Sequence, residues 1–124
     1  MTDLELVATL QIDLDRSWCV PPSFASFDNP TLIELVELYV EDTGESVRRL
    51  RTAYSCADIG AIGRLAHTLK GSSRNFHVPS IANTCEAIED LSRKRLLEPV
   101  GPLLETLEEE FPNVAAAMRQ VVGA

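Results

Sequence analysis

The chain has 124 residues, a net charge of −8 and a sequence pI near 4.7, which fits one domain large enough to bury its own core. The acidic balance argues against a nucleic-acid-binding protein, because binding phosphates needs a basic surface. Three cysteines at irregular spacing build neither a disulfide framework nor a zinc site, and no apolar run approaches a membrane span or follows a basic N-terminus. We therefore expect a cytoplasmic protein that is neither exported nor inserted into a membrane.

The first 28 residues are expected to form a helix and a connection. Apolar residues at positions 4, 6, 7 and 10 suit a helix, whereas those at 10, 12 and 14 alternate with polar residues as in a strand. We expect a helix over residues 3–18, because no other segment alternates and a lone strand would have no sheet to join. The connection SWCVPPSFASFD contains Trp18, Phe24 and Phe27, which we expect to pack against the other helices.

The second predicted helix begins at Asn29, a capping residue, followed by Pro30, whose missing N–H costs nothing in the first turn. It should run to about Tyr54. Apolar residues recur along it at helical spacing and predict one inward face. That face comprises Leu32, Leu35, Val36, Tyr39, Val40, Thr43, Val47, Leu50 and Tyr54.

A third helix, capped by Asp58, should contain the run GAIGRLAHTLKGSSRNF of residues 60–76. At 3.6 residues per turn, one face of this run is largely apolar, and His67 lies on the opposite face and is predicted to meet solvent. Gly63 and Gly71 lie one turn on either side of His67, although each interior glycine disfavours a helix by roughly 1 kcal/mol relative to alanine. The glycines therefore indicate the close approach of another body to the ring.

The face around His67 suits a site that accepts a phosphoryl group. A neutral imidazole is a nucleophile near neutral pH, and phosphoryl transfer needs little beyond positioning and charge stabilisation. Arg64, Lys70 and Arg74 lie within about two helical turns of His67 and would attract an anion. The alternative is an ordinary exposed histidine, but the two glycines and the lysine favour the phosphoryl site.

The run AHTLKGSS, residues 66–73, resembles the signature of the histidine phosphotransfer (HPt) domains of bacterial multistep phosphorelays. Asp58 lies where that family opens its active helix, and the segments LVELYVED and CEAIE resemble the helices before and after it, so the resemblance covers roughly residues 31–110. It implies an all-α, up-and-down four-helix bundle, here with an additional N-terminal helix. One exposed histidine would transfer phosphate between receiver-domain aspartates, without a nucleotide site.

The resemblance also implies roles for individual residues. His67 would be phosphorylated, Lys70 would hold phosphate oxygens, and Gly71 would let the receiver close over the ring. Cations on the same face would steer an acidic partner, an effect that salt should weaken. The expected partner contacts are Gly63, Arg64, Thr68 and Arg74.

His77 stands where the family usually has glycine, in a left-handed turn that closes the active helix. We expect a structural role for His77, because ten residues along a helix put it about 15 Å from His67. Ser80 should open the next helix, which is expected to extend to about Leu96. Its inward face should comprise Ile81, Thr84, Cys85, Ile88 and Leu91.

Two interpretations of Glu89 stay open. The family commonly has a glutamine or glutamate at this position beside the active histidine, so Glu89 would accept the Nδ1 hydrogen of His67 and leave Nε2 as the nucleophile. Alternatively, Glu89 is a surface carboxylate.

The last helix should follow a connection that contains Pro99 and Pro102. Its apolar residues recur at helical spacing from Leu103 onward. Pro112 falls inside it, and a proline there removes a hydrogen bond and clashes with the preceding turn. We therefore expect a kink or a restart near Glu110, which would let the end of this helix splay from the bundle.

The sequence thus predicts one domain, with residues 1–28 as N-terminal helix and connection and residues 29–124 as the bundle. Its predicted function is that of a phosphorelay intermediate, in which His67 takes a phosphoryl group from one receiver-domain aspartate and passes it to another. The expected partners are response-regulator receivers, one of them from a hybrid sensor kinase. The receiver would supply Mg²⁺, and the chain itself, a monomer, would hold no cofactor or metal.

Two other classes of function are compatible with a helical protein of this size. A helical adaptor could dock a receiver or another signalling protein without ever accepting phosphate, and the substitution His67→Gln separates this alternative from phosphotransfer. An independent enzyme finds little support, because the sequence has no nucleotide loop, metal-ligand spacing or Ser/His/Asp set. A covalent phosphohistidine carrier would show phosphotransferase-type activity only together with its partners.

Overall fold

The structure, a computed structural model, describes residues 18–123, and within this range its regular elements are all helices. A 3-10 turn, η1, precedes four α helices. The elements are η1 (Pro22–Phe24), α2 (Asn29–Ser55), α3 (Ile59–Asn75), α4 (Pro79–Arg93) and α5 (Val100–Val122). The helix predicted over residues 3–18 lies almost wholly outside the described residues.

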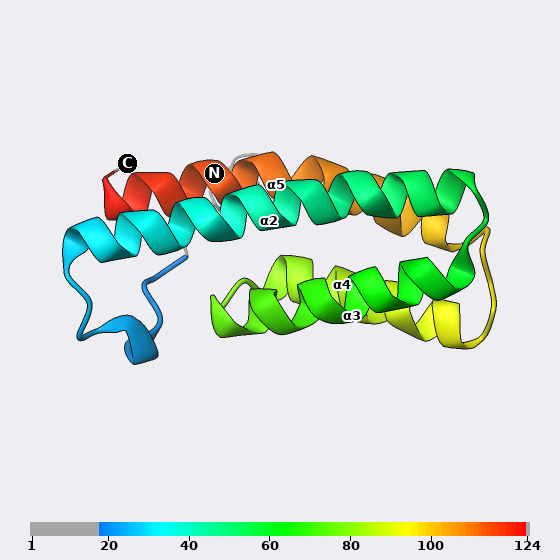
Figure 1. Ribbon diagram of the computed structural model, residues 1–124, viewed down its shortest axis with the longest axis horizontal. Coiled ribbons are helices and arrows are strands. Elements are labelled where there is room, and N and C mark those ends of the chain that lie inside the picture. The colour runs from blue at the N-terminus through cyan, green and yellow to red at the C-terminus, as the bar shows by residue number, and fades with distance from the viewer. Residues whose placement is uncertain (1–17, 124) are drawn as a thin grey trace, which may run out of the picture.

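The four helices form an up-and-down bundle, as the sequence predicts. Each helix packs against the next one in the chain, and α5 also packs against α2, which closes the bundle. The connection between α4 and α5 is longer than the two before it. Figure 1 shows α2 and α5 as a long pair above the shorter pair of α3 and α4. The bundle therefore consists of two layers, each made of two antiparallel helices.

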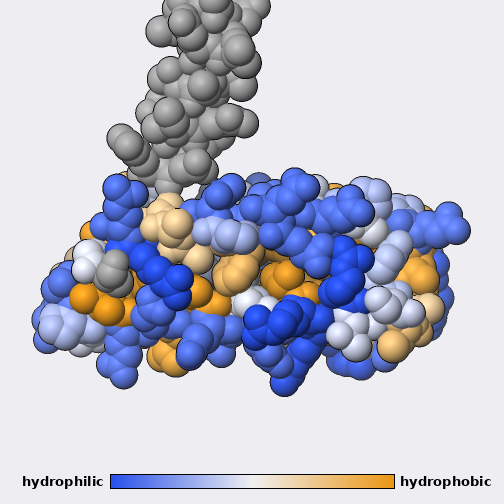
Figure 2. All heavy atoms as spheres, turned by 90° about the horizontal axis from the view of Figure 1, so that it is seen from above, coloured by the Kyte–Doolittle hydropathy of each residue, from blue (hydrophilic) through white to orange (hydrophobic). Residues whose placement is uncertain are grey.

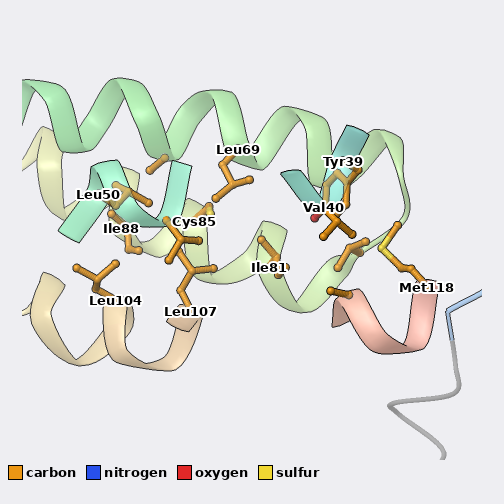
Figure 3. Packing of buried hydrophobic residues seen from close by; sticks show 14 of the residues in the cluster. Tyr39, Val40, Leu50, Leu69, Ile81, Cys85, Ile88, Leu104, Leu107 and Met118 are labelled. Carbon is orange, nitrogen blue, oxygen red and sulfur yellow. The ribbon is translucent and has the colours of Figure 1, made fainter. Parts of the chain in front are cut away.

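Apolar residues from all four helices meet in one core. Figure 3 shows Leu50 of α2, Leu69 of α3, Ile88 of α4 and Leu107 of α5 pointing toward one another. Each of these side chains is almost completely buried. Several residues expected on inward faces are only half-buried at the edges of this core, namely Leu32, Leu35, Tyr54, Thr84 and Leu91.

Side-chain caps fix where α2 and α3 begin. Asp58 Oδ1 accepts a hydrogen bond from the Ala61 N–H at 3.1 Å, so the predicted cap of α3 is confirmed. The cap of α2 is Asp28, one residue before the predicted Asn29, and its Oδ1 accepts from the Thr31 N–H at 2.9 Å. Aspartate and asparagine are equally good caps, so the sequence alone did not separate them.

The ends of α4 differ from the prediction by one and three residues. The helix starts at Pro79 rather than Ser80, since a proline fits the first turn. It ends at Arg93 rather than Leu96, because Arg95 adopts the left-handed conformation with φ 56°. The Leu96 N–H then bonds back to the Leu91 carbonyl at 2.9 Å, which closes the helix.

Helix α5 does not restart at Pro112, and its end does not splay. It is continuous from Val100 to Val122, and Pro102 belongs to its first turn instead of the connection. The residues after Pro112 include Ala115 and Met118, which are buried in the core. Burial of these apolar side chains offsets the hydrogen bond that the proline removes.

The connection before α2 packs on the end of α3. The Trp18 Nε1–H donates to the Phe76 carbonyl at 2.7 Å, and the Phe24 ring meets the Phe76 ring edge-on at 5.2 Å between centroids. Phe27 contacts Phe24 but is 42% exposed, so the expectation that it packs against the bundle is wrong. Trp18 is buried, and it holds the connection against the α3–α4 turn.

The long pair is tied together by ion pairs at its surface. Arg119 donates to both oxygens of Glu37 at 2.8 and 2.9 Å, and Arg51 binds Glu108 in the same two-pronged way. Figure 2 shows the face above these helices, where hydrophilic residues cover most of the surface and apolar residues appear in small separate areas. The arginines of this helix pair are therefore matched by carboxylates, and the pair as a whole keeps a net negative charge, with nine Asp or Glu and four Arg in α2 and α5.

Candidate functional site

His67 lies in the middle of α3, on the side away from the core. The buried residues of α3 include Ile62, Ala66 and Leu69, which seat the helix against the bundle. His67 follows Ala66 by one position, so its side chain points away from this buried face. Its side chain is 69% exposed, which confirms the predicted exposure.

Glu89 of α4 binds His67 directly. Its Oε2 lies 2.6 Å from Nδ1 of His67, and its Oε1 accepts a hydrogen bond from Nζ of Lys70. The Glu89 side chain is 11% exposed, so the interpretation of Glu89 as a surface carboxylate is wrong. One carboxylate therefore joins two residues that lie one turn apart on α3.

The charge state of Glu89 fixes the hydrogen on the ring of His67. The hydrogen bond from Lys70 lowers the pKa of Glu89, and the hydrogen bond from His67 lowers it further, against the opposing effect of burial. Glu89 is thus an ionised carboxylate at neutral pH and can only accept hydrogen bonds. Nδ1 of His67 must then be the donor, which leaves the lone pair of the neutral ring on Nε2.

Lys70 is less available than its position on the helix suggests. Its side chain is only 13% exposed and is paired with Glu89, whereas the sequence predicts an exposed cation beside the ring. An ammonium group has three hydrogens, so the bond to Glu89 occupies one of them. Lys70 can hold Glu89 and still contact an anion next to His67.

Gly71 leaves open space on one side of His67. A Cβ built at this position would meet no atom within 4 Å, and the residue is exposed. The surface next to the ring is therefore clear of side chains at this point. This geometry matches the close approach that the sequence predicts for Gly71.

Gly63 does not offer such a space, contrary to the prediction. A Cβ at position 63 would overlap Oγ of Ser92 and lie 3.2 Å from its Cβ. Ser92 also donates a hydrogen bond from Oγ to the Ile59 carbonyl at 2.8 Å. Gly63 therefore permits the close packing of α4 on α3, and the body that approaches it belongs to the same chain.

Ser92 is the residue that sequence reasoning missed. It lies three positions after Glu89, so both side chains project from the same face of α4. That spacing was visible in the sequence. Its meaning depends on which face of α4 meets α3, and this is a property of the packed bundle.

Comparison with known families adds an independent observation. A sequence model described as the Hpt domain matches residues 34–117, more than half of the chain. The chain belongs to the Hpt domain family. The matched range contains His67 and Glu89 and all of α3 and α4. Comparison with curated proteins and with solved structures finds no match.

Membership defines the general role of this Hpt domain. Hpt domains carry a phosphotransfer histidine in two-component phosphorelays, and they interact with the receiver domains of response regulators. His67 lies inside the match, is exposed and is bound by Glu89. The second histidine of the chain, His77, is also inside the match but forms the turn after α3, with φ 55°. The left-handed turn predicted at His77 is therefore confirmed.

The remaining predicted contacts of this Hpt domain lie along the exposed side of α3. Arg64 and Thr68 are exposed on either side of His67. Arg74 is exposed as well, and its Nη2 donates to Oε1 of Glu86 on α4 at 3.2 Å. The structure thus places all three predicted contact residues in exposed positions of α3.

A cavity of about 690 Å³ lies away from this site, between the connection, the turn at His77 and α5. Its lining includes Trp18, Val78 and Val114, and none of the residues on the His67 face. A phosphoryl-accepting histidine needs no cavity of its own, because the donor arrives on another protein. We therefore assign the site from the chemistry around His67.

The described residues offer neither a metal site nor a membrane-spanning helix. Residues 18–123 contain no cluster of three or more His, Cys, Asp or Glu side chains suited to holding a metal ion. Within the same range, the helices are too short or too polar to cross a membrane.

Cys85 is buried, and burial raises the pKa of its thiol to about 12, so it is not a reactive thiolate.

Proposed function

We propose that this Hpt domain is a phosphorelay intermediate that moves a phosphoryl group from one receiver domain to another through His67. The observation that supports this role best is the contact between Nδ1 of His67 and the ionised Glu89. It directs the lone pair to Nε2 on a ring that is 69% exposed. A receiver domain that approaches the exposed side of α3 would meet this ring.

The accepting step begins with an attack of Nε2 on the phosphorus of an aspartyl phosphate. The N–P bond forms as the P–O bond breaks, and the receiver's aspartate leaves as a carboxylate. No proton has to move, because Nδ1 keeps its hydrogen throughout. The ring of His67 becomes positively charged, and the Glu89 carboxylate stabilises that charge.

The donating step reverses this chemistry on a second receiver. An aspartate carboxylate attacks phosphorus, the N–P bond breaks, and the electron pair returns to Nε2. His67 is then neutral again, with its hydrogen still on Nδ1. The domain is therefore unchanged after one cycle, as a carrier must be.

The other residues of the face would serve binding. Lys70 would hold phosphoryl oxygens with its remaining hydrogens, and Gly71 would admit the receiver to the ring. Arg64, Thr68 and Arg74 would contact the receiver surface. The role assumes one cytoplasmic, monomeric domain, with Mg²⁺ held by the receiver and a hybrid sensor kinase as the source of one receiver.

The decisive experiment is transfer of labelled phosphate from phosphorylated receiver domains to the wild type and to His67→Gln. His77→Asn is the matched control, because it removes the other histidine and asparagine tolerates the left-handed conformation. We expect label that is lost in acid and survives alkali on the wild type and on His77→Asn, and none on His67→Gln.

Two outcomes would contradict this proposal. Label on His67→Gln would mean that another residue carries the phosphate. If no form of the protein takes label from any of several receivers, yet the wild type and His67→Gln bind one equally well, the domain is a phosphate-independent adaptor.

A further inference from the structure

The charge of this domain is divided unevenly along the chain. Residues 59–95, which span α3, α4 and the turn after it, contain six Lys or Arg and three Asp or Glu, a net charge of +3. The whole chain carries −8, which leaves −11 for the other residues. The helix pair that bears His67 is thus the positive part of an acidic chain.

Most cations of the domain are neutralised by a neighbouring carboxylate. Residues 18–123 contain ten Lys or Arg, and seven of these form an ion pair. The paired cations include every arginine of α2 and α5. The three that form no ion pair within this range are exposed, and they are Arg64, Lys94 and Arg95.

These three unpaired cations belong to the first half of α3 and to the turn after α4, and the start of α3 and the end of α4 lie together at the right-hand end of the pair in Figure 1. Ser92, in the last turn of α4, donates to the carbonyl of Ile59, the first residue of α3. Lys94 and Arg95 follow Ser92 directly after Arg93, and Arg64 lies in the second turn of α3. We call Arg64, Lys94 and Arg95 the basic end.

The basic end lies within reach of any domain that covers His67. At 1.5 Å per residue, Arg64 is about 4.5 Å from His67 along α3, and the start of the helix is about 12 Å away. A partner domain of 100 residues has a radius of gyration of about 13 Å, so it spans this distance. Two backbone hydrogen bonds hold this turn on the end of α4, from the Arg95 N–H to the Ser92 carbonyl at 3.0 Å and from the Leu96 N–H to the Leu91 carbonyl at 2.9 Å.

We propose that the basic end is a second docking contact for receiver domains, and that it favours receivers with carboxylates bordering the phosphorylated aspartate. This inference rests on the proposed function and adds the surface chemistry of the partner. An acidic receiver surface is repelled by most of this chain and attracted to the basic end, which orients the encounter toward His67. The contact raises the rate at which receiver and Hpt domain associate, and salt weakens this effect.

A second explanation for these cations makes a different prediction. Positive charges at the C-terminus of α4 stabilise the helix through its dipole. If this were their only role, removing them would lower the stability of the bundle and leave the rate of association with receivers unchanged. Stability and association rate must therefore be measured on the same variants.

The test compares two double variants that each remove two positive charges. Lys94→Gln/Arg95→Gly alters the basic end, and glycine suits the left-handed conformation at position 95. Arg48→Gln/Arg49→Gln is the control on α2, where both arginines are exposed and pair with Glu45. Receiver domains from the same organism, phosphorylated with acetyl phosphate, serve as donors, and unphosphorylated receivers serve for binding. Thermal unfolding followed by circular dichroism checks each fold.

We expect Lys94→Gln/Arg95→Gly to lower the second-order transfer rate about tenfold at low salt, with the rate at saturating receiver unchanged. The defect should shrink at high salt, and the control should transfer like the wild type. If both double variants show equal transfer rates and equal receiver binding, the proposal that the basic end contacts receivers is wrong. The proposed phosphoryl transfer to His67 would be unaffected by that result. If no receiver binds or phosphorylates the wild type, the proposed function and this inference fail together.

Discussion

The two glycines beside His67 divide α3 into two regions with different neighbours. Toward the start of the helix, Gly63 faces Ser92 of α4, and a side chain there would overlap it. Toward the end of the helix, Gly71 faces open space. The same residue type lies at equal distance from the ring in both directions, and only the second position is free for a partner.

This difference shows that a missing side chain has two uses within one site. At Gly63 it lets α4 come close enough to α3 for Glu89, on the same face of α4 as Ser92, to reach the ring. At Gly71 the missing side chain leaves open space beside the ring, where a partner can approach. The first region positions the histidine, and the second exposes it.

Among the substitutions that test how His67 is positioned, those of Glu89 should lower the rate of phosphoryl transfer most. Glu89→Ala removes the acceptor for the Nδ1 hydrogen and leaves Lys70 without its partner. We expect the single-turnover rate of phosphoryl transfer to fall about 100-fold, the order of effect found when one group that stabilises charge in the transition state is removed. Glu89→Gln keeps an acceptor oxygen but no charge and should fall less. Transfer by Glu89→Ala at the wild-type rate would show that Glu89 does not position the ring.

A large side chain at position 71 should hinder the approach of a receiver to His67 and leave the contact between His67 and Glu89 intact. Gly71→Leu fills the open space beside His67, and we expect about tenfold slower transfer, because small displacements from the reactive geometry are costly. Stability should not fall, since leucine is a good helix former and its Cβ meets no atom within 4 Å there. Measured transfer rates and thermal unfolding separate the two effects, and unchanged transfer would mean that receivers approach from another side.

Alanine at the two glycines should change stability in opposite directions. Gly71→Ala should stabilise the domain by about 0.5–1 kcal/mol, because alanine favours a helix. Gly63→Ala should destabilise it by about 1–3 kcal/mol, because its Cβ overpacks against Ser92. Urea unfolding measures both. In a Ser92→Gly background Gly63→Ala should cost less, and equal costs in the two backgrounds would exclude the clash as the cause.

The smallest expected effect is a dependence of stability on pH. The pKa of Glu89 is lowered in the folded state, chiefly by the hydrogen bond from Lys70. The stability that this carboxylate contributes is therefore present above its unfolded pKa and is lost as pH falls through the lowered folded pKa. The stability difference between wild type and Glu89→Gln should be constant near pH 7 and shrink below the usual glutamate range. A difference that instead grows on acidification would contradict this assignment.

Helical periodicity was sufficient to predict the four helices and the exposure of His67, because both depend on local patterns of apolar residues. Periodicity could not predict that Glu89 contacts His67 or that Gly63 packs against Ser92. Both contacts depend on which side of α4 packs against α3. The unbroken path of α5 through Pro112 was missed for a related reason. Buried residues beyond the proline hold the helix in place, and local propensity does not include them.

The hydrogen bond from Trp18 to the Phe76 carbonyl gives the domain a spectroscopic probe of its own. Trp18 is the only tryptophan in the chain, so its fluorescence comes from one place, where the connection meets the end of α3. Release of the connection would expose the indole to water and shift its emission to longer wavelengths, while the helical circular dichroism of the bundle stays the same. Detachment of this segment can therefore be followed without any label.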